Sequence, residues 1–439
     1  MMLIKRRLKA RPEEKDMQQL NNKLTRRVLA SALLAALSGG VMAQGFMEER
    51  KVETRIYGFL NGEIESVKAE GGATPYGSRG RVSDGNSRIG FAGSIGIKGD
   101  VRGLWQIEGS LNNFDEGGIN GQGKSSTIES RNTFVGIESK RFGRFIIGNN
   151  DSVYRSLVGS GGALGGNLGL TVQGLDVWNN TSAQLSGNAD SLFGRGEARY
   201  KNSAHYLTPQ WNGFQAGASY GFDEVRDTGD DRARYALAAK YSLGAFSIGA
   251  GYDRRQNTGV DVENLSKGFG FRNTSVSGVN TSFYKVLATY KFPTKTSVGL
   301  GFEAGSYGYA LQSLPTPGNI YTALKTGSMK QRSVMASLTQ EVGEDISVML
   351  AAGKLGKLDN TTFGRADDFG ATQVSLGATY KIDEQFMPYV YFTRINNKSQ
   401  QNVNLGQSPL HSNKAGTDDA FLAPGNSPRA FGIGMIARF

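Results

Sequence analysis

The side chains that most often carry out catalysis are scarce in this chain. It has two histidines, His205 and His411, and no cysteine. A serine or cysteine nucleophile needs a histidine beside it and a third group that orients that histidine. His205 is followed by Tyr206 and His411 by Ser412, and neither histidine has a convincing partner in the sequence. Because cysteine is absent, a disulfide framework and cysteine-ligated metals are excluded. We therefore expect no enzymatic activity, no metal site and no cofactor.

A glycine-rich stretch, Gly159 to Gly169, is the other segment that chemistry could use. A phosphate-binding loop would need a Lys-Ser or Lys-Thr pair after the glycines and a helix behind them, and both are missing. The stretch lies within residues 150–197, the longest early connection between the predicted elements. On composition alone, the stretch could belong to a disordered loop.

The first 43 residues have the layout of a secretory signal peptide. Lys23, Arg26 and Arg27 precede an apolar run from Val28 to Leu37, and small residues lead to Ala43. The run is too short for a membrane anchor, which needs about 20 residues. We predict cleavage after Ala43, with residues 1–43 as extension and signal and residues 44–439 as one domain. Met17 is a candidate start of translation.

The net charge of +11 mostly reflects this leader. The leader carries nine basic and three acidic residues, so its +6 leaves about +5 for residues 44–439. A charge this small gives little support to nucleic-acid binding. Mean hydropathy is −0.36, which is compatible with a transmembrane barrel because every second residue of such a barrel faces a wet lumen.

Period-2 alternation recurs along the rest of the chain. In residues 87–98, Ile89, Phe91, Ile95 and Ile97 share one face, and Arg88 lies on the other. About sixteen such segments can be counted, each roughly ten residues long, which is the length of a tilted membrane-spanning strand. The predicted segments are 54–67, 87–98, 102–114, 129–138, 143–149, 198–208, 213–223, 232–242, 245–255, 281–292, 296–308, 330–342, 345–356, 371–382, 386–396 and a last segment that includes Phe431 to Phe439.

Connection lengths also alternate. Short ones include 140–142, 243–244, 293–295, 342–345 and 382–385, and long ones include 68–86, 115–128, 150–197, 256–280, 309–329, 357–370 and 397–428. This asymmetry is typical of outer-membrane barrels. Aromatic residues near strand ends are expected to form interfacial girdles: Tyr57, Phe59, Tyr200, Tyr206, Tyr220, Phe222, Tyr241, Tyr290, Phe292, Tyr380, Tyr389, Tyr391 and Phe392. A soluble β-sandwich is the alternative, but at this length it would need two domains and no linker is visible. We predict an all-β, antiparallel transmembrane barrel of about sixteen strands.

The order of motifs resembles the Gram-negative trimeric porins, especially the β-proteobacterial type. The motifs are Thr54 to Gly58, Ser87 to Phe91 with Gly93, Arg131 with Phe134 to Ile137, Tyr200 to Ser203, and Ser427 to Phe439. Each is weak alone, and their order across residues 44–439 makes the set specific. The chain departs from the family pattern at two places. Ala92 stands where the family has a lysine, and Asn149 and Asn150 follow Gly148 where the family usually has an arginine.

The resemblance implies that the third loop, residues 150–197, folds into the barrel and narrows the pore. It also implies that Arg88 and Arg131 are wall cations. The alternation places Arg88 opposite the lipid face, whereas Arg131 shares its parity with Val135 and Ile137. The full set expected at the constriction comprises Arg88, Arg131, Arg195, Arg199, Asp151, Asp176 and Asp190. Each could instead be a solvated charge without a special role. Four arginines against two or three acids favour a weak anion preference.

The resemblance further implies a homotrimer in the outer membrane, in contact with lipid and lipopolysaccharide. The barrel-assembly machinery would recognise the last strand, which ends at Phe439. The implied function is passive diffusion of small hydrophilic solutes and ions, with no nucleic acid bound. A substrate-specific channel and a plugged structural or adhesive barrel are the alternatives.

Overall fold

The computed structural model describes residues 52–111, 128–159, 164, 192–224, 231–260, 273–275, 278–312, 324–361, 364–406, 409–410 and 422–439. The predicted signal peptide and its cleavage position lie outside these residues. The described elements are β1 (Val52–Glu70), β2 (Tyr76–Asp84), β3 (Arg88–Lys98), β4 (Val101–Leu111), β5 (Ile128–Ser130), β6 (Thr133–Ser139), β7 (Gly143–Asp151), α2 (Val153–Val158), β8 (Arg199–Leu207), β9 (Phe214–Gly221), β10 (Arg234–Leu243), β11 (Phe246–Arg255), β12 (Thr258–Val260), β13 (Asn273–Ser275), β14 (Thr281–Lys291), β15 (Thr296–Gln312), β16 (Leu324–Val342), β17 (Ile346–Asp359), η3 (Ala366–Phe369), β18 (Ala371–Tyr380), β19 (Phe386–Asn397) and β20 (Ser427–Arg438).

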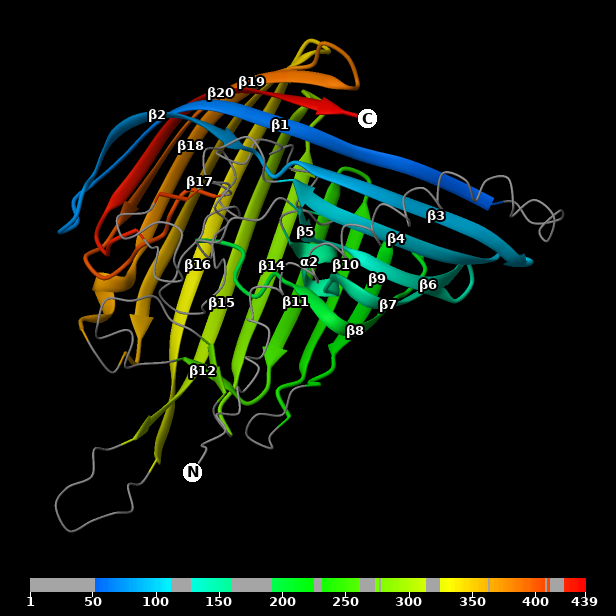
Figure 1. Ribbon diagram of the computed structural model, residues 1–439, viewed down its shortest axis with the longest axis horizontal. Coiled ribbons are helices and arrows are strands. Elements are labelled where there is room, and N and C mark those ends of the chain that lie inside the picture. The colour runs from blue at the N-terminus through cyan, green and yellow to red at the C-terminus, as the bar shows by residue number, and fades with distance from the viewer. Residues whose placement is uncertain are drawn as a thin grey trace, which may run out of the picture. The chain divides into compact units, whose positions relative to one another are not determined.

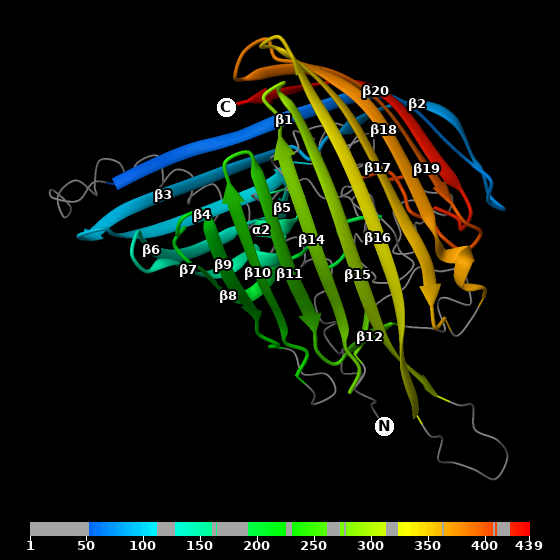
Figure 2. The ribbon, with the colours of Figure 1, turned by 180° about the vertical axis from the view of Figure 1, so that it is seen from behind.

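The strands form a closed antiparallel barrel (Figures 1 and 2). Eighteen described strands belong to one sheet, and β20 closes the ring by pairing with β1. β2 and β3 both pair with β1, and β5 and β6 both pair with β4, so each of these pairs is one wall strand with an interruption. The wall therefore has sixteen strands, as the alternation predicted.

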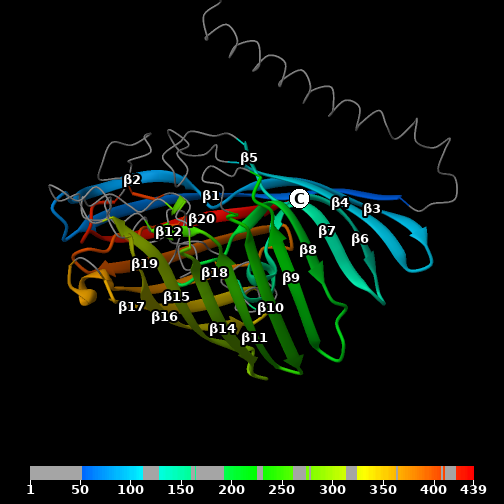
Figure 3. The same ribbon diagram turned by 90° about the horizontal axis from the view of Figure 1, so that it is seen from below.

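Alternation along each strand separates a lipid face from a lumen face. On β20, Phe431, Ile433 and Met435 are 49%, 57% and 53% exposed, whereas Gly432 and Gly434 between them and Ala430 and Ile436 on either side are buried. Phe439 continues the outward row and closes the ring against β1, where its backbone exchanges hydrogen bonds with Gly58 (Figure 3). Strands can span a bilayer when their outward side chains are apolar and their backbone groups are paired within the barrel. The predicted outward face of the last strand is confirmed.

The connections differ in length at the two ends, as expected, but several long ones are shorter than predicted. Residues 68–86 are mostly strand, because β1 continues to Glu70 and β2 begins at Tyr76. β15 and β16 extend to Gln312 and from Leu324 into the segment predicted as a loop (Figure 2). The alternation of apolar and polar residues did not predict these extensions, because the strands there are glycine-rich or polar and have no apolar lipid face. In the described part of the chain, no helix has the length and apolarity needed to cross a membrane.

The aromatic residues predicted as girdles fall into two groups. Eight lie on the outer face or its rims, as predicted: Tyr206, Tyr220, Phe222, Tyr241, Tyr290, Phe292, Tyr380 and Phe392. Five face inward, because their strand parity is the opposite one: Tyr57, Phe59, Tyr200, Tyr389 and Tyr391. The inward tyrosines hydrogen-bond to wall carboxylates or amides, such as Tyr57 to Glu108 at 2.9 Å and Tyr389 to Asn61 at 2.6 Å. For these five the girdle prediction is wrong.

Candidate functional site in the barrel interior

A bulge between β5 and β6 decides where Arg131 points. β4 pairs Gln106 with Phe134 but Gly109 with Ser130, so the register shifts by one residue at Arg131 and Asn132. A one-residue shift moves every following side chain to the other face of the sheet. Arg131 therefore faces the lumen although Val135 and Ile137 face lipid. A second interruption, between β2 and β3, places Asn86 in the left-handed region at φ 67°.

Arg131 is held by groups from β4 and from the interruption between β2 and β3. Its Nε donates to Glu108 Oε1 at 2.6 Å, and its Nη1 donates to Asn86 Oδ1 at 3.0 Å and to Ser110 Oγ at 3.3 Å. The other carboxylate oxygen of Glu108 accepts from Tyr57 at 2.9 Å. Arg131 is 7% exposed, so Glu108 balances its charge and the guanidinium is fixed in the wall.

Three further arginines lie around this pair. Arg155 of α2 and Arg199 of β8 form ion pairs with the same oxygen of Asp151, with Nε to Oδ1 distances of 3.1 and 3.2 Å. Asp151 itself is held by Asn132 of the bulge, which accepts from its backbone N–H and donates to its carboxylate. Arg88 interacts electrostatically with four of these charged groups: Arg131, Arg155, Glu108 and Asp151. We call Arg88, Arg131, Arg155, Arg199, Glu108 and Asp151 the arginine cluster, whose net charge is +2.

The guanidinium of Arg88 rests on an aromatic ring and not on a carboxylate. Its guanidinium carbon lies 4.6 Å from the centre of the Phe59 ring, and its Nε has no hydrogen-bond partner among the described residues. Arg144 stacks in the same way on Phe134 at 4.9 Å. A stacked guanidinium is stabilised by the ring while its remaining donors stay available to solutes. A carboxylate would instead cancel the charge.

The third loop turns back into the lumen at both of its described ends. After β7, Ser152 caps α2 by accepting from the backbone N–H of Arg155 at 3.2 Å, and Val153, Tyr154, Leu157 and Val158 are buried. Figure 1 shows α2 inside the ring of strands. This helix fits because the facing wall positions are glycines: a Cβ on Gly251 would lie 2.7 Å from the Tyr154 ring, and one on Gly217 the same distance from Val153. An inward-folded loop is confirmed for these residues.

The returning end of the loop is anchored by buried ion pairs. Arg195, 2% exposed, donates from Nε to Glu303 Oε1 at 2.7 Å, from Nη1 to Tyr307 at 2.7 Å and from Nη2 to Ser333 at 2.8 Å. Lys285 of β14 forms ion pairs with Glu197 of the loop and, at 3.2 Å, with Glu303 of β15. These contacts tie the loop to strands that lie across the ring from the arginine cluster.

A fourth ion pair completes this loop anchor. Arg234 of β10 binds Asp253 of β11 at 2.9 Å and donates to the carbonyl oxygen of Gly196 at 2.8 Å. The anchor thus contains three cations, Arg195, Lys285 and Arg234, and three carboxylates, Glu197, Glu303 and Asp253. It is electrically neutral. Arg195, which the sequence placed among the constriction cations, is buried in this neutral anchor, so its charge does not face the lumen.

The remaining predicted residues are placed as follows. Arg88, Arg131, Arg199 and Asp151 meet in the arginine cluster, whereas Asp176, Asp190 and His411 lie outside the described residues. Asn149, at the position where the family has an arginine, donates to the carbonyl oxygen of Arg131 at 2.7 Å and so supports the bulge.

His205 is the histidine that the structure describes. It is 4% exposed, and its ring nitrogens lie 2.8 Å from Ser203 Oγ and Ser219 Oγ. Ser219 also accepts from the backbone N–H of Val153 at 2.8 Å. His205 therefore positions Ser219, which in turn binds the first residue of α2. The histidine is buried and does not face solutes.

Sequence reasoning missed Glu108, Arg155 and the acids of the loop anchor. Arg155 is four residues from Asp151, and this spacing would have suggested an ion pair had a helix been expected there. Glu108 lies on the polar face of its strand, so parity alone could have identified it. Glu197, Glu303 and Asp253 carry no local signal, since their partners are 19 to 108 residues away.

A further long connection, between β19 and β20, also packs inward at its described residues. Val403, Leu405, Leu410 and Leu422 are at most 6% exposed and join the same buried cluster as Leu358 of the wall. Asn397 ties this segment to the wall by donating to the carbonyl oxygens of Val403 and Asn426, both at 2.7 Å. The long-loop mouth is therefore narrowed from the β17–β20 side as well.

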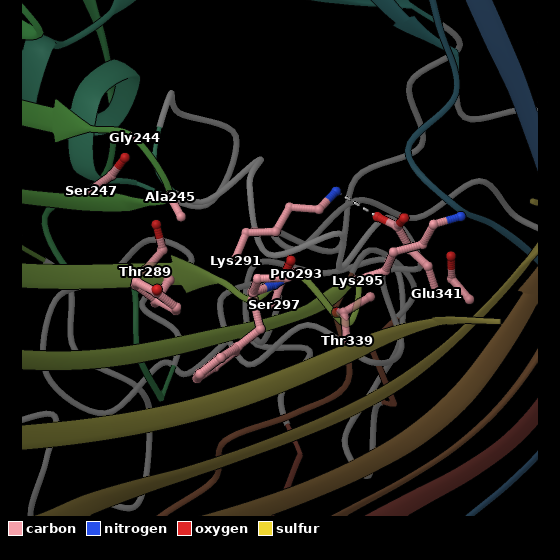
Figure 4. Close-up of a pocket in the computed structure, with 13 residues that line it drawn as sticks. Gly244, Ala245, Ser247, Thr289, Lys291, Pro293, Lys295, Ser297, Thr339 and Glu341 are labelled. Carbon is pink, nitrogen blue, oxygen red and sulfur yellow. Dashed lines mark hydrogen bonds and ion pairs between the residues drawn. The ribbon is translucent and has the colours of Figure 1, made fainter. Parts of the chain in front are cut away.

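The short-turn mouth is polar. A hollow of about 890 Å³ lies inside the turns that join β10 to β11, β14 to β15 and β16 to β17 (Figure 4). Ser247, Thr289, Ser297 and Thr339 line it, and Lys291 pairs with Glu341 at 2.8 Å. A second hollow of about 840 Å³ lies at the same end, beside Arg102, Glu138 and Arg144. Both are parts of a water-accessible vestibule below the arginine cluster.

A sixteen-stranded barrel with an apolar outer face, a polar interior and an inward third loop defines an outer-membrane pore. Residues 30–400 match the family model described as Gram-negative porin. The chain therefore belongs to the Gram-negative porin family and is a channel of the outer membrane for small solutes.

Individual proteins agree with this assignment. The chain is 22% identical to an outer membrane porin protein of Bordetella pertussis over 83% of its own length and 92% of that protein. The fold is similar to the anion-selective porin from Comamonas acidovorans, with a TM-score of 0.60, 17% identity and coverage of 89% and 100%. It is also similar to the trimer form of OmpT from Vibrio cholerae, with a TM-score of 0.55, 15% identity and coverage of 88% and 99%.

Proposed function

We propose that this channel passes small anions in preference to cations of the same size. The observation that carries the proposal is the unequal charge of the two inner surfaces. The arginine cluster on β3–β8 and α2 has a net charge of +2, and the loop anchor on β10–β16 is neutral. We expect solutes that pass the third loop to meet the positive charge of this cluster.

The strength of this preference depends on distance and salt. Two unit charges about 8 Å apart in water interact by ~0.5 kcal/mol, and less when salt screens them. The stacked Arg88 and Arg144 extend the positive wall toward the short-turn mouth. A preference of this kind applies to small anions in general. Recognition of one substrate would instead need a ring of directed hydrogen-bond partners.

Liposome swelling with three solutes of nearly equal size tests the proposal. We expect gluconate to enter faster than glucose, and glucose faster than protonated glucosamine, at low ionic strength. The differences should shrink in 1 M salt, where the Debye length is about 3 Å. Equal rates for all three solutes, or faster entry of glucosamine, would contradict an anion preference. Saturation with one solute alone would support a substrate-specific channel.

We further propose that the chain assembles as a homotrimer and that its signal peptide is cleaved after Ala43. The family resemblance and the similarity to a trimeric porin structure support the trimer. The basic, apolar and small-residue layout before Ala43 supports the cleavage site. The outward apolar rows support contact with lipid, and the terminal Phe439 supports recognition by the barrel-assembly machinery. An unheated sample that migrates only as the monomer in a gel would argue against the trimer.

A further inference from the structure

Gln331 of β16 is a buried side chain whose amide joins three parts of the chain. It is 1% exposed. Its Oε1 accepts from Arg195 Nη1 at 3.4 Å, and its Nε2 donates to the carbonyl oxygens of Gly356 and Phe369, both at 2.9 Å. The two carbonyl oxygens need donors and the guanidinium needs an acceptor, so these partners fix the orientation of the amide. All of its hydrogen-bonding groups are thereby paired.

A bulge explains why Gln331 is fixed in the wall. β16 pairs Gln331 with Leu358 and Ser333 with Leu355, so β17 has one extra residue between these two pairs. A bulge takes backbone groups of the extra residue out of the strand ladder, and a buried carbonyl group then needs another donor. Gly356 lies in this bulge, and Gln331 Nε2 is a donor to its carbonyl oxygen.

The carbonyl oxygen of Phe369 is a junction between the wall and the outer loops. Besides the bond from Gln331, it accepts one from Nε2 of Gln401, in the β19–β20 connection, at 2.8 Å. A backbone hydrogen bond from Gln400 to Asp368, at 2.9 Å, joins the same two segments. η3 is therefore held by β16 on one side and by the β19–β20 connection on the other.

The β19–β20 connection carries these contacts on to the turn between β1 and β2. The carbonyl oxygen of Gln401 accepts from the backbone N–H of Gly425 at 2.9 Å. The next residue, Asn426, is fully buried; its Oδ1 accepts from the N–H of Gly72 at 2.9 Å, and its Nδ2 donates to the carbonyl oxygen of Thr74 at 2.6 Å. We call this hydrogen-bonded unit the outer cap; it comprises η3 and residues 71–75, 397–405 and 422–426.

We propose that Gln331 positions the third loop by joining it to the outer cap, so that the loop and the cap hold their places as one unit. The path runs from Arg195, at the returning end of the third loop, through Gln331 to Phe369 and Gln401. These four side chains are at most 2% exposed. Water therefore cannot replace a lost hydrogen bond unless the packing around it opens.

Coupling between two sites acts in both directions. A change in the outer cap should therefore loosen the third loop, and a change where the third loop meets the wall should loosen the cap. The inference rests on the inward course of the third loop and not on the proposed anion preference.

Gln401→Met tests the first direction, because it removes a contact of the cap without touching the third loop. The single-channel current of the refolded full-length protein reports motion of the third loop. We expect this variant to spend roughly fivefold more time than wild type in altered conductance levels, as the loss of one buried hydrogen bond predicts. Gln331→Met should have at least this effect. The double variant should differ little from Gln331→Met, because both substitutions break the same path.

The second direction can be tested because the chain has no cysteine. Val403 of the outer cap is 0% exposed, so the rate at which a Val403→Cys channel reacts with a water-soluble maleimide reports opening of the cap. Gln331→Met should raise this rate roughly fivefold. Gln340→Met is the matched control. Gln340 lies on the same strand at the short-turn end, where it donates to the carbonyl oxygen of Thr294 at 3.0 Å, and we expect it to change neither measurement.

Three results would overturn the inference. The first is a Gln401→Met channel with the current of wild type although its Val403→Cys form reacts faster, because the cap would then move without the loop. The second is full additivity of Gln331→Met and Gln401→Met, which would place them on separate paths. The third is an equal change of the current in the Gln340→Met control. If Gln331→Met does not refold, the current of Gln401→Met against that of its control decides the question.

Discussion

Replacing Arg195 by alanine should detach the returning end of the third loop from the barrel wall. The substitution leaves the buried carboxylates of Glu197 and Glu303 with Lys285 as their shared cation. Removing one partner of a buried ion pair typically costs about 3–5 kcal/mol, because an uncompensated charge stays buried. We expect a lower midpoint of urea unfolding and larger fluctuations of the single-channel current, since the loop would sample positions away from the wall.

A paired substitution separates charge from packing. Arg195→Met with Glu303→Met removes one cation and one carboxylate and leaves Lys285 paired with Glu197. Replacing a buried ion pair by apolar residues of similar volume is often neutral or stabilising, so this variant should be closer to wild type in both measurements. If the single Arg195→Ala variant has the urea midpoint and the current fluctuations of wild type, the anchor does not hold the loop.

Arg88→Glu should reduce the anion preference more than any other single change in the arginine cluster. Arg88 has no ion-pair partner among the described residues, so its full charge faces the lumen. Arg131, by contrast, is balanced by Glu108 at 2.6 Å. Reversing a charge about 8 Å from a permeating ion changes its energy by ~1 kcal/mol, which corresponds to about fivefold in permeability. The zero-current potential in a salt gradient measures the change.

Arg254→Glu is the matched control for this prediction. Arg254 lies on β11 with the parity of the outward residues Ile248 and Tyr252, so the same charge reversal takes place outside the lumen. We expect its zero-current potential to equal that of wild type. A shift as large as that of Arg88→Glu would mean that the selectivity reflects the overall charge of the protein rather than the wall of the pore.

Much of the barrel could be predicted from alternation, because a two-residue period is what a wall between lipid and water requires. This is why the sixteen strands and the inward position of Arg88 were predictable. The inward position of Arg131 was not predictable, because a one-residue bulge changes the parity and the local sequence pattern does not show the bulge. The inward tyrosines were missed for a related reason: an aromatic residue suits either face of the wall, and only its pairing partner shows which one.

The third loop shows a different limit. Its inward course was implied by family resemblance, and its anchoring depends on pairs such as Arg195 with Glu303, which are 108 residues apart. Charges that look alike in the sequence therefore have different roles. Arg195 belongs to a neutral buried cluster, whereas Arg88 rests on a phenylalanine ring and stays charged. The number of arginines favours an anion preference, but it does not show which arginines face the pore.

The most direct test of the central claim is the zero-current potential of the wild-type channel in a planar bilayer under a potassium chloride gradient. The uncompensated arginine cluster predicts the sign of an anion-selective channel, with a magnitude that falls as the salt concentration rises. A potential with the sign of a cation-selective channel would contradict the account.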